Sequence, residues 1–270
     1  MFGVDKPVIG MLHIPSLPGA PLNKLDLKAI TRWVIDDAKA LTDGGVDGLL
    51  LENFGDIPFY PQQVPPHTVA FMTALGVEVR RNFRLPLGIN VLRNDPESAL
   101  AIAAAVSAEF IRVNIHVGAR LTDQGVVQGS AHSTIRYRKL LGSDIKIYAD
   151  VDVKHSAPLA ARGLRNEVEE MVTRGCADAV IVTGSATGHE ASLEDLKSAK
   201  AAAGTVNVIA GSGVNAANVT AVLKIADALI VGTSFKQGGV TTNPVDPGRV
   251  QAFMEAVRNL RTALPNALQR

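Results

Sequence analysis

Short apolar runs alternate with stretches of helical periodicity along almost the whole chain, and this alternation limits the fold more than any other feature. The eight runs begin 22 to 40 residues apart, which leaves room for a helix between each pair. Continuously apolar runs are typical of parallel strands covered on both faces. The pattern predicts an α/β protein with a closed (β/α)8 barrel, the TIM-barrel fold, and an open doubly wound sheet is the alternative. The predicted strands are Pro7–Leu12, Val46–Leu51, Pro86–Val91, Glu109–Asn114, Ile145–Val153, Asp178–Thr183, Val206–Ala210 and Ala228–Val231.

The segments between the runs favour the barrel over the open sheet. Val250–Leu264 carries apolar residues at helical spacing, and Asp95-Pro96 is a typical N-cap followed by a first helical residue. The first run ends in Met11-Leu12-His13, where a nucleotide-binding open sheet would carry a glycine-rich turn. One aliphatic barrel, poor in aromatic residues at 4%, therefore accounts for residues 1–270 as a single domain.

The charge balance and the cysteine content limit the partners and the compartment. There are 27 Lys and Arg against 26 Asp and Glu, and a net charge of +1 argues against a nucleic-acid partner, which usually requires a basic excess. No apolar run reaches about 18 residues, so we expect no transmembrane segment, and the N-terminus does not resemble a signal peptide. A single cysteine, Cys176, is typical of a reducing compartment, and we expect a cytoplasmic protein.

An acidic residue stands at the start of several predicted strands. Asp47, Asp178 and Asp227 share this position, and Glu109 is a looser copy. In a barrel these residues lie on the N-terminal face, where side chains usually serve stability. We therefore exclude all of them from the active site.

Polar residues gather instead where the predicted strands end, which is where barrels of this kind build their sites. Glu52 and either Asp150 or Asp152 are candidate general bases, and Lys154 completes the catalytic candidates. The substrate-binding candidates are His13, Asn53, Asn90, Arg112, Asn114, Asp123 and Thr183.

Strand alternation indicates that some of these charges point into the barrel. Asp150, Asp152 and Lys154 share one face of their strand, and Arg112 and His116 share one face of the preceding strand. Because an unpaired buried charge is costly, we expect Arg112 to pair with Asp150 or Asp152. The alternative is an ion-pair network that only fills the barrel.

Lys154 could form a Schiff base, act as a general base or hold an anion. Two inward carboxylates would stabilise its charge, which favours an electrostatic role, because a nucleophilic amine needs a lowered pKa. No motif indicates a cofactor. A divalent metal ion could be bound by His13, Glu52, Asp150, Asp152 and His155, although no ligand spacing is diagnostic.

Glycine-rich loops after the last strands predict a phosphate site. Gly211-Ser212-Gly213 follows the seventh strand, and Gly232-Thr233 follows the eighth. These are the loops that frequently bind phosphate in this fold, because glycine lets backbone N–H groups approach an anion. Asn215 is expected to cap a helix there, and Lys236 could add charge. A third glycine loop, residues 183–188, could extend the site. The alternative to a phosphate site is that the loops after the seventh and eighth strands are simply two tight turns.

Three long loops are also expected near the site. Residues 14–25 and 58–66 are rich in proline, and residues 117–131 are rich in glycine. Loops of this size in a compact domain tend to be functional. Phe59 and Tyr60 could line the substrate or a subunit contact, so a homo-oligomer is expected.

Several of these motifs together resemble the BtpA family over nearly the whole chain. The resemblance rests on Gly10–His13, Glu52–Asp56, Gly88–Asp95, Phe110–Asn114, Thr122–Gly125, Ala149–His155, Gly211–Val214 and Val231–Thr233. The family is named for a membrane-associated photosystem I biogenesis protein, and similar proteins are called SgcQ-like. The resemblance implies a barrel but no catalytic residues. Some members are described as nucleoside triphosphatases, but this chain lacks the P-loop motif.

Two functions follow as hypotheses. The first is an enzyme that acts on a small phosphorylated metabolite, such as a sugar-phosphate isomerase, epimerase or aldolase-like lyase. The second is a non-catalytic photosystem I biogenesis or stability factor associated with membranes. The sequence favours the enzyme, because inward charges are costly to keep without use.

Overall fold

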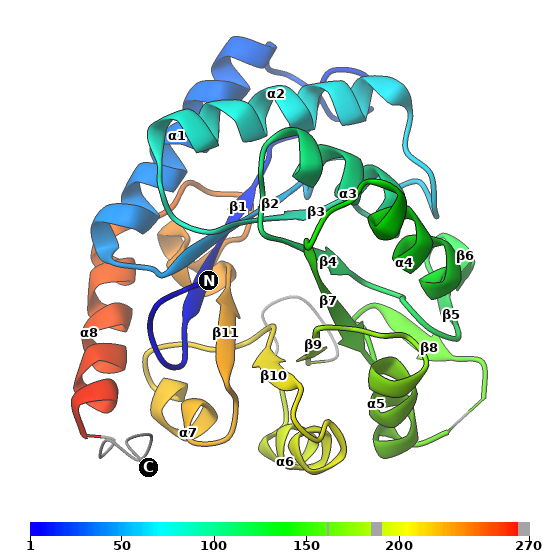
Figure 1. Cartoon of the computed structure of the whole chain (residues 1–270). Coiled ribbons are helices and arrows are strands. Elements are labelled where there is room, and N and C mark those ends of the chain that lie inside the picture. The colour runs from blue at the N-terminus through cyan, green and yellow to red at the C-terminus, as the bar shows by residue number, and fades with distance from the viewer. Residues whose placement is uncertain (161, 185–190, 264–270) are drawn as a thin grey trace.

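The computed structural model describes residues 1–160, 162–184 and 191–263. Eight parallel strands close into a barrel in the order β1-β11-β10-β9-β7-β4-β3-β2 (Figure 1), which confirms the fold predicted from the alternation. The barrel strands are β1 (Val8–His13), β2 (Gly48–Glu52), β3 (Leu87–Asn90), β4 (Phe110–Val113), β7 (Lys146–Val151), β9 (Ala179–Val182), β10 (Asn207–Ala210) and β11 (Ala228–Val231).

Helices surround the barrel on the outside (Figure 1). The Asp95 side chain caps α3 by accepting from the Ser98 N–H at 3.0 Å, as the sequence predicted. Gly45, with φ at 93°, ends α1 in the left-handed conformation that favours glycine. The helices are α1 (Leu27–Gly44), α2 (Pro66–Asn82), α3 (Pro96–Ala105), α4 (Ala131–Leu140), α5 (Leu164–Thr173), α6 (Leu193–Ala202), α7 (Val219–Leu223) and α8 (Pro247–Ala263), with short 3-10 turns η1 (Thr233–Phe235) and η2 (Gln237–Gly239).

The helix after β10 begins later than the sequence predicted. Asn215 does not cap it, because α7 starts at Val219. The Asn215 side chain instead accepts from the Ala217 and Asn218 N–H groups, and this closes a turn ahead of the helix. The loop Gly211–Gly213 is therefore separated from the start of the helix by residues 214–218.

Besides a small apolar cluster of Ile115, Val127 and Val153, two large ones form most of the core. The larger one lies between the strands and the helices, and includes Leu51, Ile111 and Val180. The smaller one fills the N-terminal half of the barrel interior with Ile9, Met11, Leu50, Phe110, Tyr148, Ala179, Ile181, Ile209, Ala228 and Ile230. Polar side chains begin one step further along the same inward faces, so the polar part of the barrel interior lies in its C-terminal half.

The acidic residues at the strand starts fasten neighbouring strands together. In each case the carboxylate accepts from a backbone N–H of the neighbouring strand at 2.7 to 2.9 Å. The pairs are Asp47 with Val8, Glu109 with Leu87, Asp178 with Ile147 and Asp227 with Val208. Each acid also pairs with a basic side chain, for example Asp47 with Arg261 at 2.5 Å. These contacts account for the repeated sequence pattern and support its exclusion from the site.

A small antiparallel sheet stands beside the barrel, where the sequence predicted only a long loop. It consists of β5 (Ala119–Thr122), β6 (Gly125–Gln128) and β8 (Ser156–Pro158), in the order β6-β5-β8 (Figure 1). Gly125, with φ at 90°, allows the tight turn between β5 and β6. Within the part of the chain that the structure describes, none of the helices is long and apolar enough to cross a membrane.

Candidate functional site

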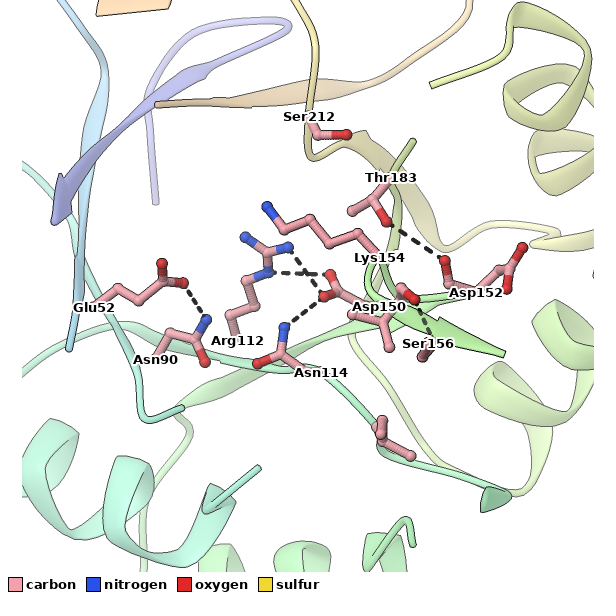
Figure 2. A network of polar contacts seen from close by, with 12 residues as sticks. Glu52, Asn90, Arg112, Asn114, Asp150, Asp152, Lys154, Ser156, Thr183 and Ser212 are labelled. Atoms are coloured by element: carbon pink, nitrogen blue, oxygen red, sulfur yellow. Dashed lines mark hydrogen bonds and ion pairs between the residues drawn. The ribbon is translucent and has the colours of Figure 1, made fainter. Parts of the chain in front are cut away.

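A pocket opens at the carboxyl ends of the barrel strands and brings together both halves of the predicted site. Side chains of His13, Glu52, Arg112 and Lys154 line one part of it. The other part is lined by two segments that we call the glycine loops, Gly211–Gly213 after β10 and Gly232–Ser234 after β11. Figure 2 shows Glu52, Arg112, Lys154 and Ser212 around the same space.

Arg112 forms the predicted pair, and its partner is Asp150. The guanidinium donates two parallel hydrogen bonds of 3.0 Å to the two carboxylate oxygens, and Asn114 adds a third at 2.7 Å (Figure 2). Both side chains of the pair are buried. Burial alone would lower the pKa of Arg112, but the nearby Asp150 and Glu52 carboxylates outweigh it and raise that pKa. The Arg112–Asp150 pair is thus held in place at the base of the pocket, with three hydrogen bonds to the Asp150 carboxylate.

Glu52 is the carboxylate that lines the pocket. It ends β2, and Asn90 at the end of the adjacent β3 donates to its Oε2 at 2.5 Å. Its Oε1 lies 3.8 Å from Nε2 of His13. This contact is not an ion pair, because burial and then the nearby Lys236, Lys154 and Arg112 charges hold the pKa of His13 well below its usual value. The imidazole is neutral and packs against Phe54, with ring centroids 4.8 Å apart.

Lys154 lies just after β7 and reaches into the pocket. Burial, and then the Arg112 charge, lower its pKa to about 8, against the raising effect of Glu52 and Asp150. No hydrogen bond or ion pair links its Nζ to any residue that the structure describes. The two carboxylates expected to stabilise this lysine do not pair with it, because Asp152 points out to Arg120, and Arg112 and Asn114 already bind Asp150.

Asp152 does not point into the barrel, contrary to the alternation argument. Regular strand geometry ends at Val151, and Asp152 has a left-handed backbone with φ at 50°. Its side chain is 62% exposed and pairs with Arg120 at 2.5 Å. His116 departs in the same way, since β4 ends at Val113 and the buried imidazole Nε2 contacts the Gly175 carbonyl oxygen at 2.8 Å.

The remaining predicted substrate-binding residues lie outside the pocket wall. Asn53 is buried and holds the loop after β3, accepting from the Leu92 N–H at 2.7 Å. Asp123 is exposed in the turn between β5 and β6. Thr183 donates to the Asp152 carbonyl oxygen at 3.5 Å. Asn90 and Asn114 act on the site through Glu52 and Asp150 rather than by lining it.

The glycine loops bring backbone rather than side chains to the pocket. A Cβ on Gly211 would lie 2.4 Å from Ile181 Cγ2, and one on Gly232 would lie 2.8 Å from His13 Cε1. Gly213 has φ at 69°, a conformation that favours glycine. The Ser212 hydroxyl accepts from the Gly184 N–H at 2.7 Å, which ties the start of the third glycine loop to the site. Residues 185–188 of that loop lie outside the described residues.

The positive charge beside the glycine loops comes from Arg249 rather than from Lys236. Lys236 is buried away from the pocket, where it pairs with Asp37 of α1 at 2.6 Å. Arg249, in the first turn of α8, lines the pocket and donates to the Ser234 carbonyl oxygen at 3.1 Å. No spacing in the sequence marks Arg249, because its place depends on how α8 returns to the mouth of the barrel.

The side chains considered for a divalent metal ion do not converge. In residues 1–160, 162–184 and 191–263, no three His, Cys, Asp or Glu side chains lie close enough together to hold a metal ion. Glu52 and Asp150 are separated by Arg112, and Asp152 faces solvent.

The sequence profile of the BtpA family matches residues 4–259. This chain belongs to the BtpA family. It is 44% identical to the photosystem I biogenesis protein BtpA of Synechocystis sp., over 95% of this chain and 89% of that protein. It is 42% identical to an uncharacterized protein of Pyrococcus horikoshii, over 95% of this chain and 98% of that protein.

Solved structures show the same fold at low sequence identity. The native KDPGal structure matches 95% of this BtpA-family chain and 96% of its own, with a TM-score of 0.57 and 16% identity. The N-(5'-phosphoribosyl)anthranilate isomerase of Pyrococcus furiosus matches 94% of this chain and 99% of its own, with a TM-score of 0.55 and 13% identity. The TM-scores establish the shared barrel fold. Identities this low do not allow any active-site residue to be carried over to this chain.

Proposed function

We propose that this BtpA-family chain is an enzyme that acts on a small phosphorylated molecule. The observation that carries the proposal is that one pocket is lined by the glycine loops, by Arg249, and by Glu52 and Lys154. The phosphate would sit between the loops and Arg249, and the reacting carbons would lie beside Glu52 and Lys154. Fixed binding of the phosphate supplies the orientation that an acid–base reaction needs.

The side chains of the pocket fit proton transfer next to a carbonyl group. Glu52 has one carboxylate oxygen bound to Asn90 and the other directed toward His13, so it is held in one orientation and can take a proton from carbon. Arg112 and Lys154 would stabilise the negative charge that develops on the carbonyl oxygen. This chemistry serves isomerases and epimerases of sugar phosphates, and also lyases that cleave the adjacent carbon–carbon bond.

Titration calorimetry with inorganic phosphate tests the phosphate site. Arg249→Ala should weaken phosphate binding by roughly tenfold, which corresponds to about 1.4 kcal/mol, because it removes the guanidinium that lines the pocket beside the glycine loops. Arg258→Ala is the matched control, since it removes the same charge from an exposed position on the same helix. Equal binding by both variants, or no phosphate binding by the wild type, contradicts the proposal.

Hydrogen exchange at carbon tests the chemistry. NMR of dihydroxyacetone phosphate in heavy water should show protein-dependent loss of its C–H signal, and Glu52→Gln should abolish this exchange while phosphate binding remains. Exchange that Glu52→Gln leaves unchanged would remove the carboxylate from the mechanism.

The name of the Synechocystis relative supports a second candidate, a biogenesis factor for a membrane complex. The chain is almost as similar to the uncharacterized Pyrococcus horikoshii protein (42%) as to the Synechocystis protein (44%). Only the name of the second mentions photosystem I, so sequence similarity alone does not favour this role. It predicts co-sedimentation with anionic lipid vesicles. Absence of co-sedimentation, together with phosphate binding in the pocket, would favour the enzyme.

A further inference from the structure

The amine of Lys154 stands out among the charged groups of the pocket because no carboxylate pairs with it, although Glu52 and Asp150 are nearby. Asp150 accepts three hydrogen bonds, two from Arg112 and one from Asn114. Glu52 accepts from Asn90 through Oε2. No described side chain donates to or accepts from Lys154 Nζ, so the amine is presented to the pocket without a carboxylate partner (Figure 2).

The cations around Lys154 work against its own charge. Arg112 lines the same pocket, and Arg93, which donates to the Lys154 carbonyl oxygen at 2.7 Å, lies beside its backbone. Both guanidinium charges oppose protonation of the amine, and burial acts in the same direction. A lysine kept for its charge alone is best placed next to a free carboxylate. Glu52 and Asp150 oppose these effects only in part, because neither pairs with the amine, and a desolvated amine beside other cations is the setting of a nucleophilic lysine.

We propose that Lys154 Nζ forms a Schiff base with the carbonyl carbon of a phosphorylated aldehyde or ketone whose phosphate is held by the glycine loops. This inference rests on the proposed function and narrows its substrate class from phosphorylated molecules in general to those with a free carbonyl group. It also moves Lys154 from an electrostatic role to a covalent one.

The step balances within the pocket. The neutral amine attacks the carbonyl carbon, a C–N bond forms, and the carbonyl oxygen becomes a hydroxyl by taking one proton. The hydroxyl then leaves as water, with a second proton, as the C–N double bond forms. The two protons carried off in the water are the two N–H protons that the amine loses, and Glu52 is the group in the pocket that can relay them. Protonation of the imine nitrogen then gives a cation that withdraws electrons from the neighbouring carbon.

The imine would extend the chemistry available to Glu52. Electrons left behind by loss of a proton or by cleavage of a carbon–carbon bond at the adjacent carbon are accepted by the protonated imine. Hydrolysis of the imine, which adds back one water, releases the product and restores the free amine. The site thus needs no external oxidant or reductant.

Borohydride trapping followed by mass spectrometry tests the proposal. The probes are dihydroxyacetone phosphate and glycolaldehyde phosphate, each compared with its unphosphorylated counterpart. With borohydride, the chain should gain the mass of one probe less one oxygen atom, and the modified peptide should contain Lys154. Inorganic phosphate should suppress this labelling, and the unphosphorylated probes should label Lys154 at least tenfold more slowly.

Two variants separate the covalent role from an electrostatic one. Lys154→Arg keeps a positive charge without a nucleophilic amine, so it should bind inorganic phosphate and give no adduct. Lys39→Arg makes the same change at an exposed lysine of α1 and should label as the wild type does. The rate of labelling should also rise with pH and level off above about pH 8, as the neutral amine becomes the main form.

The outcomes distinguish this inference from the proposed function. If phosphate binds with the expected loss in Arg249→Ala, but neither phosphorylated probe labels Lys154, the Schiff base is wrong and the phosphate-binding enzyme stands. If phosphate does not bind, both fail. Equal labelling of Lys154→Arg and the wild type would place the adduct on another lysine and overturn the inference.

Discussion

Asp150, Asp152 and Lys154 alternate in the sequence, yet the fold gives them three different environments. Asp150 is buried in a pair with Arg112, Asp152 is exposed beyond the end of the strand, and Lys154 turns back into the pocket. The left-handed backbone at Asp152 produces this divergence, since it breaks the alternation that the strand maintains up to Val151. At the scale of single residues, the backbone turn at Asp152 and the partners that each side chain finds thus decide the environment of these groups.

The different environments of the two aspartates predict different stabilities for the same substitution. Asp150→Asn should lower the free energy of unfolding by about 3–5 kcal/mol, because Arg112 is left as a buried charge without its carboxylate partner. Asp152→Asn is the matched control and should change it by less than about 1 kcal/mol, since the carboxylate is exposed and Arg120 keeps Glu167 at 3.4 Å. Urea denaturation of both variants gives the comparison. Equal losses would mean that the Arg112–Asp150 pair does not stabilise the fold.

At the scale of elements, some side chains that do not line the pocket hold in place the segments that do. Lys236 follows η1 and pairs with Asp37, which also accepts from the Val245 N–H at 2.7 Å. One aspartate of α1 therefore holds both ends of the segment between β11 and α8. Burial lowers the pKa of Lys236 and the Asp37 carboxylate opposes this effect, so the pair depends on the aspartate.

This anchoring predicts an effect of α1 on the distant glycine loop. Asp37→Asn should destabilise the fold by about 3–5 kcal/mol, because it leaves Lys236 as a buried charge without a carboxylate. It should also weaken phosphate binding several-fold by loosening Gly232–Ser234. Asp36→Asn, an exposed neighbour on the same helix, is the control. Calorimetry and denaturation together check this, and phosphate affinity equal in both variants would show that the loop holds its position without Asp37.

At the scale of the whole molecule, closure of the barrel brings residues from both ends of the chain into one site. β1 pairs with both β2 and β11, so His13 lies against Gly232 across more than two hundred positions of sequence. This closure buries the imidazole, holds it neutral and makes it a contributor to the pH dependence of stability.

The sign of that pH dependence follows from the lowered pKa of His13. Below about pH 6.5 the unfolded chain binds a proton at this residue that the folded chain does not bind, so stability falls as pH falls and is level above that pH. His13→Asn removes this contribution. The unfolding free energy of the wild type should therefore fall more steeply than that of the variant between about pH 6.5 and 5, by up to about 1.4 kcal/mol per pH unit. Parallel curves would show that His13 is protonated in the folded state.

The sequence by itself determined the barrel, the pairing of Arg112 with an aspartate of the next strand and the structural role of the acids at the strand starts, and it placed the candidate site at the mouth of the barrel. Each of these follows from a local period or from a position relative to a strand, and such relations are fixed by backbone geometry. The sequence therefore also placed Glu52, Lys154 and the glycine loops in one neighbourhood.

Only the tertiary structure decided what lies beyond the strand ends and between distant elements. The turn at Asp152, the hairpin of β5 and β6, the burial of Lys236 against Asp37 and the arrival of Arg249 at the pocket are set by packing over long sequence separations. The state of Lys154 was decided there too. The charge of a buried amine depends on which neighbours have satisfied their own hydrogen bonds, and local sequence does not encode that.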